Sequence, residues 1–352
     1  MDIASGYVPL VDVTRGDLVE SVHFGAIAVC NQQGDLFAST GDPELSTYLR
    51  SSSKPFQLLP LIELGGVEKF NLSDREISVM CASHSGTDLH VKTVRRIQEK
   101  IHVSESDLLC GIHAPTNKES ANALRLNNQS PTQNHHNCSG KHTGFLAQAV
   151  LNHYSKEDYI NPNHPVQKIV IQTFSEMAHE DEKDIHIGID GCSAPVFGIP
   201  LHNAAWAFAS LADPQRLAEQ RKSACLKISH AMTSYPEMVA GFGEFDTRLM
   251  QVGNGKIISK GGAEGYQGIA LLPGAIHQDS PALGIAFKIS DGDPSRRASN
   301  FVAVEVLHQL GALDDGQIRA LEEFYLKPVT NWRGLTVGQL KSSFELIFSL
   351  LP

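Results

Sequence analysis

The sequence lacks the features that mark membrane proteins and nucleic-acid-binding proteins. None of its apolar runs reaches the roughly 18–20 residues that a bilayer-spanning helix needs. No block of Lys or Arg occurs, and the formal net charge is −10. A basic patch is what attracts a protein to nucleic acid or to an anionic membrane surface. We therefore expect neither a nucleic acid nor a membrane among its partners.

The cysteines lack the spacing of a disulfide framework. The chain has 6 cysteines, none of them in a C-x-x-C motif, at positions 30, 81, 110, 138, 192 and 225. Disulfide frameworks are typical of short secreted chains, whereas this one has 352 residues. The N-terminal segment also shows no basic region followed by an apolar core, as a signal peptide would. We predict free thiols in a cytoplasmic protein.

The composition is that of a globular protein with a sizeable core, at 41% hydrophobic and 19% charged residues. Extended patterns occupy about 7–40 and about 256–290, and helical patterns fill the middle. No internal repeat or linker separates these parts. We predict a single domain over 1–352 of the α/β (α+β) class, with a mixed, largely antiparallel sheet flanked by helices.

A serine run precedes an apolar stretch at Arg50–Pro55, where Ser51 and Lys54 stand in the pattern S-x-x-K. If a helix begins inside this run, the two side chains share one face. A neutral lysine can act as the general base for a serine nucleophile, and backbone N–H groups at a helix N-terminus can bind an oxyanion. The alternative is a plain helix cap, because serine is among the best N-cap residues.

Two further segments follow in an order that carries chemistry. Ser83 lies in a loop of small residues, and Lys260 begins a K-G-G at the end of a predicted strand. The order S-x-x-K, serine loop, K-x-G resembles serine β-lactamases and penicillin-binding proteins. The loop departs from their Ser-Asp-Asn pattern, since His84 follows Ser83. Each segment alone could be structural, but together they indicate a Ser/Lys amidohydrolase.

A second cluster could bind a metal ion. Cys138, followed by Lys141 and His142, and Cys192, preceded by Asp190, are thiols beside glycines in separate segments. Two thiols that meet can hold a soft divalent ion such as zinc. The alternative is that both are small buried hydrophobic residues, and lysine is rarely a metal ligand.

Five segments together resemble the class 3 (rhizobial-type) L-asparaginases, the L-asparaginase II family, from near residue 7 to about 334. They are 50–55, 82–86, 137–142, 190–195 and 260–265. The resemblance implies a fold similar to serine β-lactamases, penicillin-binding proteins and glutaminases, and a homodimer. It also implies that L-asparagine is hydrolysed to L-aspartate and ammonia.

The same resemblance assigns roles to individual residues. Ser51 with Lys54 would form one Ser–Lys tandem, and Ser83 with Lys260 the other. The resemblance also implies a zinc site beside the active site that is not obligatory for catalysis, formed by Cys138, Lys141 and Cys192.

These roles define an acyl-enzyme mechanism. Ser51 would attack the amide carbon, while Lys54, held neutral by burial and by the charge of Lys260, would take its proton. Ser83 would relay a proton to the departing ammonia. By comparison with β-lactamases, the oxyanion donors would be the N–H groups of Ser51 and Ala263. The neighbouring serines 52 and 53 leave the identity of the nucleophile open.

The zwitterionic end of the substrate needs its own contacts. Asp190 suits the α-ammonium, and Arg50 or a protonated Lys141 suits the α-carboxylate. His84, Ala263 and Glu264 complete the predicted substrate-binding set. Three alternatives remain: a penicillin-recognising Ser/Lys amidase, a glutaminase, and a catalytically silent relative that binds amino acids.

Overall fold

The computed structural model describes residues 3–349, which form two compact units. The first unit takes the chain up to Ser52, Gly198–Asp213 and the chain from Leu249 onward. The second takes Ser53–Phe197 and Pro214–Arg248. The boundary between them therefore falls inside the serine run. The assignment of 1–352 to one domain stays a prediction.

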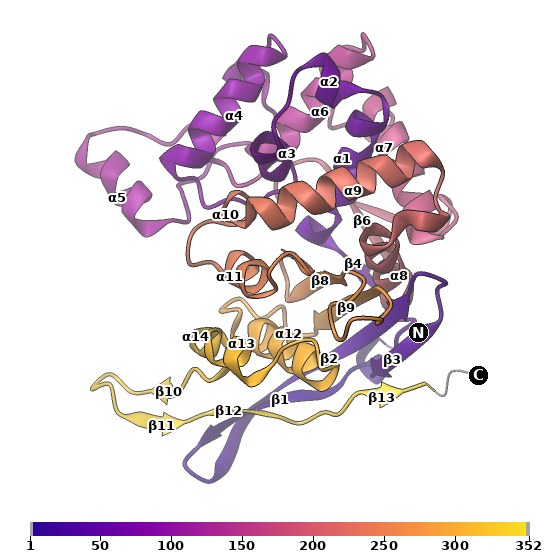
Figure 1. Ribbon diagram of the computed structural model, residues 1–352. Helices are drawn as coiled ribbons and strands as arrows, with labels where there is room; N and C mark the ends of the chain where they lie inside the picture. Colours follow the sequence, from indigo (N-terminus) through magenta and orange to yellow (C-terminus); the bar gives the residue numbers. More distant parts are fainter. Residues whose placement is uncertain (1–2, 350–352) are drawn as a thin grey trace. The chain divides into compact units, whose positions relative to one another are not determined.

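An eight-stranded antiparallel sheet forms the core of the first unit (Figure 1). Its main path is β12-β1-β2-β9-β8-β7, and β3 pairs with β2 and β13. The predicted class is confirmed, because N-terminal strands pair with late ones from Gly25↔Ile289 to Asn31↔Leu283. The strands are β1 (Val8–Arg15), β2 (Leu18–Asn31), β3 (Leu36–Thr40), β7 (Ile257–Gly261), β8 (Tyr266–Leu271), β9 (Leu283–Ile289), β12 (Leu340–Ser342) and β13 (Ile347–Phe348).

The inner half of β2 explains why this strand is central. Residues 26–30 are all apolar and fully buried, as expected for a strand covered on both faces. Helix α8 (Leu201–Ala212) covers one face very closely. A Cβ at Gly284 would lie 1.9 Å from the Ala205 carbonyl oxygen, so only glycine permits this approach. The same face carries Gly268, which pairs with Lys260 on β7.

Short elements complete the first unit, in which β4 pairs with residues 198–200 of β6. A two-stranded hairpin, β10 with β11, lies near the C-terminus. The elements are η1 (Ile3–Gly6), β4 (Ser46–Tyr48), η2 (Arg50–Ser53), β6 (Pro195–Pro200), α12 (Arg297–Gln309), α13 (Asp315–Arg319), α14 (Glu322–Tyr325), β10 (Val329–Thr330) and β11 (Thr336–Gly338).

Helices build the second unit around α1, which packs against α6, α7 and α9. All eight residues from Lys54 to Leu61 in α1 are buried, and Pro60 lies inside the helix. Helix α3 starts with a capping box, in which the side chains of Ser73 and Glu76 each accept the backbone N–H of the other residue. No helix among residues 3–349 is both long and apolar enough to cross a bilayer. The elements are α1 (Lys54–Glu63), α2 (Gly66–Lys69), α3 (Asp74–Met80), α4 (Asp88–Lys100), η3 (Glu105–Asp107), α6 (Ser139–Leu151), α7 (Pro165–Ala178), β5 (His186–Ile189), η5 (Pro214–Arg216), α9 (Glu219–Ser234), α10 (Pro236–Val239) and α11 (Phe245–Val252).

The polar segment 112–137 of the second unit contains a helix of its own. Helix α5 (Lys118–Leu126) and the turn η4 (Gln133–His135) lie within it. The side chain of Asn117 caps α5 by accepting the N–H of Ser120 at 2.8 Å. No residue of α5 is buried, so this helix is held mainly by its two ends.

Candidate functional site

In the second unit, the lysine of the S-x-x-K motif meets the serine of the small-residue loop. Lys54 is the first residue of α1, and its side chain is 1% exposed. Its Nζ lies 2.6 Å from the Ala82 carbonyl oxygen, 2.8 Å from Ser83 Oγ and 3.2 Å from Cys138 Sγ. The Ser83 hydroxyl and the Cys138 thiol can each donate or accept, so a proton can pass between Lys54 and Ser83 without any side chain moving.

The Ser83 loop is fixed by backbone bonds and by His84. The N–H of Ser83 donates to the Val239 carbonyl at 2.9 Å. His84 is fully buried; its Nδ1 accepts the N–H of Gly86 at 3.1 Å, so its Nε2 carries the proton and donates to Ser139 Oγ at 2.8 Å. Both ring nitrogens of His84 are thus hydrogen-bonded to other groups of the protein. In this geometry His84 therefore holds the loop in place.

Burial keeps His84 neutral and ties the stability of the second unit to pH. Burial, and next the neighbouring His90, whose ring stacks at 5.0 Å, hold the pKa of His84 well below its usual range. Below about pH 6.5 the unfolded chain therefore takes up a proton at this histidine that the folded chain refuses. Stability contributed by the neutral imidazole is present above that pH and is lost as the pH falls.

We expect His84→Gln to flatten this pH dependence. Between about pH 6.5 and 5.5, the free energy of unfolding should fall less steeply in the variant, by about 1.4 kcal/mol per pH unit. Urea titrations at several pH values measure the slope. His153→Gln, at an exposed position, serves as the control and should keep the wild-type slope. An unchanged slope in His84→Gln would show that His84 is protonated in the folded protein.

The three serines of the run have different environments. Ser51 is half-buried, whereas Ser52 and Ser53 are buried. The Ser52 hydroxyl donates to the Lys260 carbonyl oxygen at 2.6 Å and so joins η2 to the end of β7. Ser51 is therefore the most exposed serine of the run.

Gly262, directly after β7, allows the serine run to pack closely against the end of this strand. A Cβ at Gly262 would lie 2.4 Å from the Leu49 carbonyl oxygen and 3.2 Å from Ser52 Oγ, so η2 can pack there only against glycine. Lys260 is 1% exposed, and its Nζ donates to the Gly261 carbonyl at 2.7 Å.

The turn that follows β7 brings further predicted residues of the first unit together. Ala263 and Glu264 are exposed, and Glu264 has a φ of 61°, in the left-handed region. Arg50 Nη1 lies 3.9 Å from Glu264 Oε1, a loose ion pair. The first unit thus holds Arg50, Ser51, Lys260, Ala263 and Glu264.

The second unit brings the two predicted thiols together with Lys141. Lys141 Nζ lies 2.9 Å from Cys192 Sγ, and all three side chains are buried. A hydrogen bond from Cys138, then the charge of Lys141, hold the pKa of Cys192 far below its usual range. The same bond, together with burial, raises the pKa of Cys138. The pair therefore consists of one thiolate and one thiol.

Lys141 is protonated in this arrangement. Burial lowers its pKa, but the negative charge of Cys192 and its hydrogen bond with Lys141 outweigh burial, and the net change is upward. Asp190 lies at the rim of the cluster, with Oδ2 3.8 Å from Cys192 Sγ. The second unit thus holds Lys54, Ser83, His84, Cys138, Lys141, Asp190 and Cys192.

The donors of this cluster fit a zinc ion in kind, since zinc prefers sulfur and nitrogen ligands. Among residues 3–349, no group of three or more His, Cys, Asp or Glu side chains could hold a metal ion. A site here would therefore depend on Lys141 as third donor. Binding would have to displace the protons of Cys138 and Lys141.

Tyr159, which no sequence motif marks, supports the same cluster. Its hydroxyl lies 2.7 Å from Nδ1 of His142, the neighbour of Lys141 on α6, and accepts the N–H of Leu109 at 2.9 Å. Burial lowers the pKa of His142 to about 4. Tyr159 stands 17 residues after His142, and a separation of this length belongs to no motif that would predict their contact.

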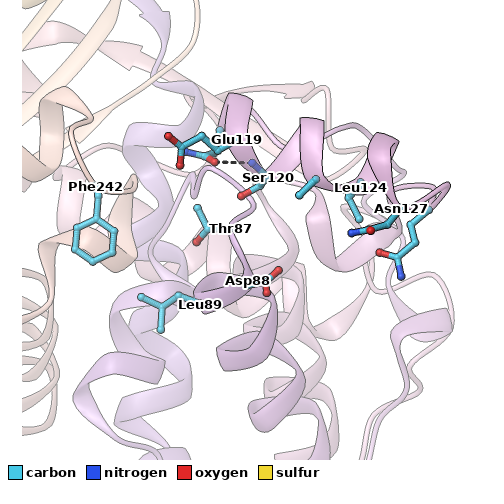
Figure 2. A pocket seen from close by; sticks show the side chains of 11 residues that line it. Thr87, Asp88, Leu89, Glu119, Ser120, Leu124, Asn127 and Phe242 are labelled. Atoms are coloured by element: carbon cyan, nitrogen blue, oxygen red, sulfur yellow. Dashed lines mark hydrogen bonds between the residues drawn. The ribbon is translucent and has the colours of Figure 1, made fainter.

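A pocket of about 570 Å³ lies between α5 and the start of α4 (Figure 2). Thr87, the N-cap of α4, and Leu89 line it, together with Phe242 and with Ser120 and Leu124 of α5. The Ser83 loop leads directly to Thr87, and the N–H of Asn117 donates to the Ser85 carbonyl at 3.0 Å. The pocket and the loop therefore share a backbone connection.

Comparisons with known proteins give the following similarities. A family model described as L-asparaginase II matches residues 11–342. A crystal structure of a Bacillus glutaminase is 13% identical at a TM-score of 0.37 and covers 81% of this chain and 90% of its own. A probable glutaminase from Bacillus subtilis complexed with 6-diazo-5-oxo-L-norleucine is 12% identical at a TM-score of 0.38, covering 81% and 84%. None of the curated proteins compared with the chain matches it.

Proposed function

Because the chain belongs to the L-asparaginase II family and is an amidohydrolase of that kind, we propose that it hydrolyses L-asparagine to L-aspartate and ammonia. The observation that carries the proposal is the contact of the buried Lys54 Nζ with Ser83 Oγ at 2.8 Å. A buried amine beside a hydroxyl can accept and return protons during acyl transfer.

In the proposed mechanism, Ser51 Oγ attacks the side-chain amide carbon and Lys54 takes the hydroxyl proton. The tetrahedral intermediate expels ammonia, to which Lys54 returns the proton through Ser83. Water then attacks the resulting ester, again with proton transfer to Lys54, and releases aspartate with Ser51 restored. The N–H groups of Ser51 and Ala263 would bind the oxyanion, and Lys260 would place its positive charge beside the reacting groups.

The proposed substrate contacts are Asp190 for the α-ammonium, with Arg50 and Lys141 as the predicted cations for the α-carboxylate. Glu264 adds a carboxylate near Arg50. Lys141 is already paired with Cys192 at 2.9 Å, and Arg50 lies 3.9 Å from Glu264, so both cations have competing partners. His84 would contribute by holding the Ser83 loop.

An ammonia-release assay tests the proposal. L-Asparagine should be hydrolysed with a higher kcat/KM than L-glutamine, and a chromogenic β-lactam should not be hydrolysed. Faster release from glutamine would identify a glutaminase, and β-lactam hydrolysis would identify a penicillin-recognising amidase. Tight amino-acid binding without ammonia release would identify a catalytically silent relative.

We also propose a zinc site formed by Cys138, Lys141 and Cys192. Bound zinc would supply a positive charge that holds both sulfurs as thiolates and Lys141 as a neutral amine. Removing the ion returns Lys141 to its protonated pairing with Cys192, which alters a predicted substrate cation and leaves Lys54 and Ser83 in place.

Chelation should therefore raise KM for asparagine more than it lowers kcat. Cys192→Ala should reproduce the effect of chelation, because Cys192 holds Lys141. Cys138→Ala should do the same and in addition remove a contact of Lys54. Initial rates over a range of asparagine concentrations measure both constants. Loss of kcat at every asparagine concentration would replace the Ser–Lys mechanism with a metal-bound hydroxide.

We propose that the protein acts as a cytoplasmic homodimer. All six cysteines are buried free thiols, which suits a reducing compartment. The dimer follows from the family resemblance, and light scattering would measure the mass of the assembly.

A further inference from the structure

A second pocket, of about 360 Å³, lies at the end of β7 in the first unit. The turn after Lys260 forms one side of it, and the loop before α12 forms the other. Its lining includes Ala263, Glu264, Asp291, Asp293 and Arg296. The pocket therefore combines the predicted oxyanion turn with residues that the sequence did not single out.

Arg296 reaches into the space that a side chain at Gly261 would occupy. A Cβ at Gly261 would lie 2.2 Å from Arg296 Nη2, so the guanidinium takes that place directly after Lys260. Arg296 caps α12 with φ 55° and ψ 18°, a left-handed conformation that arginine adopts at an energetic cost. The same guanidinium lies 3.5 Å from Gln267 Oε1 on β8.

The carboxylates of this pocket are engaged elsewhere. Asp291 lies 2.7 Å from His23, and the buried Asp293 accepts the N–H and the hydroxyl of Ser299 at 2.7 and 2.9 Å. Glu264 pairs loosely with Arg50. Among residues 3–349, no carboxylate lies within ion-pair distance of Arg296. A guanidinium in this state is a binding group for an external carboxylate.

The strand geometry sets Arg296 apart from the serine run. Successive residues of a strand face opposite sides, so Lys260 and Gly262 face one side and Gly261 faces the other. The serine run packs at Gly262, through Ser52, and Arg296 packs at Gly261. The serine run and Arg296 therefore meet adjacent residues at the end of β7, the last strand of the sheet path.

We propose that Arg296 binds the α-carboxylate of the substrate. This inference rests on the proposed function, because it takes the substrate to be an α-amino acid amide whose side-chain end faces Ser51. It assigns the carboxylate to a cation with no competing carboxylate, in preference to Arg50 or Lys141.

The test compares L-asparagine with 3-aminopropanamide, the same molecule without its α-carboxylate. Arg296→Ala should lower kcat/KM for asparagine by roughly 10- to 100-fold, the usual effect of losing a hydrogen bond to a charged group. The loss should appear as a higher KM, because Arg296 would bind the carboxylate equally in the bound substrate and in the transition state. The kcat/KM for 3-aminopropanamide should not change. Arg296→Lys keeps the positive charge but lacks the paired N–H donors of the guanidinium. Its kcat/KM for asparagine should therefore lie between the values for the wild type and for Arg296→Ala.

Arg297→Ala is the matched control. Arg297 is the next residue, donates to His23 Nε2 at 3.0 Å and is not part of the pocket lining, so its loss should leave the ratio of the two substrates unchanged. An equal loss for both substrates in Arg296→Ala would overturn the proposal, because Arg296 would then only support β7. An unchanged rate for asparagine would overturn it as well.

The same variants separate this inference from the proposed function. If the wild-type protein released no ammonia from asparagine or glutamine, the proposed function would fail. Calorimetric binding of L-aspartate then decides the role of Arg296. Binding that is weakened by Arg296→Ala and not by Arg297→Ala supports the carboxylate site. Equal binding by all three proteins, or none by the wild type, overturns it.

Discussion

Replacing Ser51 with alanine should reduce asparagine turnover by about 10⁴- to 10⁶-fold, the loss usual for an enzyme deprived of its nucleophile. Ser51 is the half-buried serine of the run, whereas the hydroxyl of Ser52 is occupied by the Lys260 carbonyl at 2.6 Å. Without Ser51 Oγ no acyl-enzyme can form. Steady-state ammonia release measures the loss, and mass spectrometry of quenched enzyme should detect an acyl adduct in the wild type alone.

Ser52→Ala is the control for this prediction. It leaves the Lys260 carbonyl without its side-chain donor in a buried place, so it should lower the free energy of unfolding by about 1–3 kcal/mol. Its turnover should nevertheless exceed that of Ser51→Ala by orders of magnitude. A dead Ser52→Ala beside a nearly normal Ser51→Ala would identify Ser52 as the nucleophile.

Lys54→Met should reduce kcat by about 10²- to 10⁴-fold, the usual contribution of a general base. Methionine preserves the apolar stem in the core of the second unit but removes the contacts with Ser83 Oγ, the Ala82 carbonyl and Cys138 Sγ. Ammonia release at saturating asparagine measures the loss, and circular dichroism shows whether the helices persist.

Lys54→Arg separates proton transfer from charge. Arginine keeps the positive charge but does not deprotonate, so it should be as inactive as methionine if Lys54 is a base. An arginine variant with substantial turnover would instead assign Lys54 a purely electrostatic role, and the proton would have to leave Ser51 by another path.

Much of the sheet could be predicted because its strands carry strong local patterns. The apolar run 26–30 identifies a strand buried on both faces, and such a strand needs partners from elsewhere in the chain. The strands β10, β11, β12 and β13 have only two or three residues each, too few to show an alternation. Pro60 lies inside α1, yet the helix continues to Glu63, because tertiary packing outweighs the hydrogen bond lost at the proline.

Lys54 and Ser83 were both predicted as catalytic residues, but as members of different Ser–Lys tandems. Their contact depends on the fold of the second unit, which the residue types and spacings do not reveal. Arg296 could not be predicted in this way. In the sequence it is one of two adjacent arginines, and its position depends on the missing side chain of Gly261 and on the register of β7 with β8. Neither is visible as a local pattern.

Helix α5 gives the second unit two levels of stability. Because none of its residues is buried, opening α5 exposes little apolar surface and costs a small part of the free energy of global unfolding. The amide hydrogens of 118–126 should therefore exchange with solvent long before those of α1. A protease would cut this segment first, and amino-acid changes that accumulate there would leave the core of the unit intact.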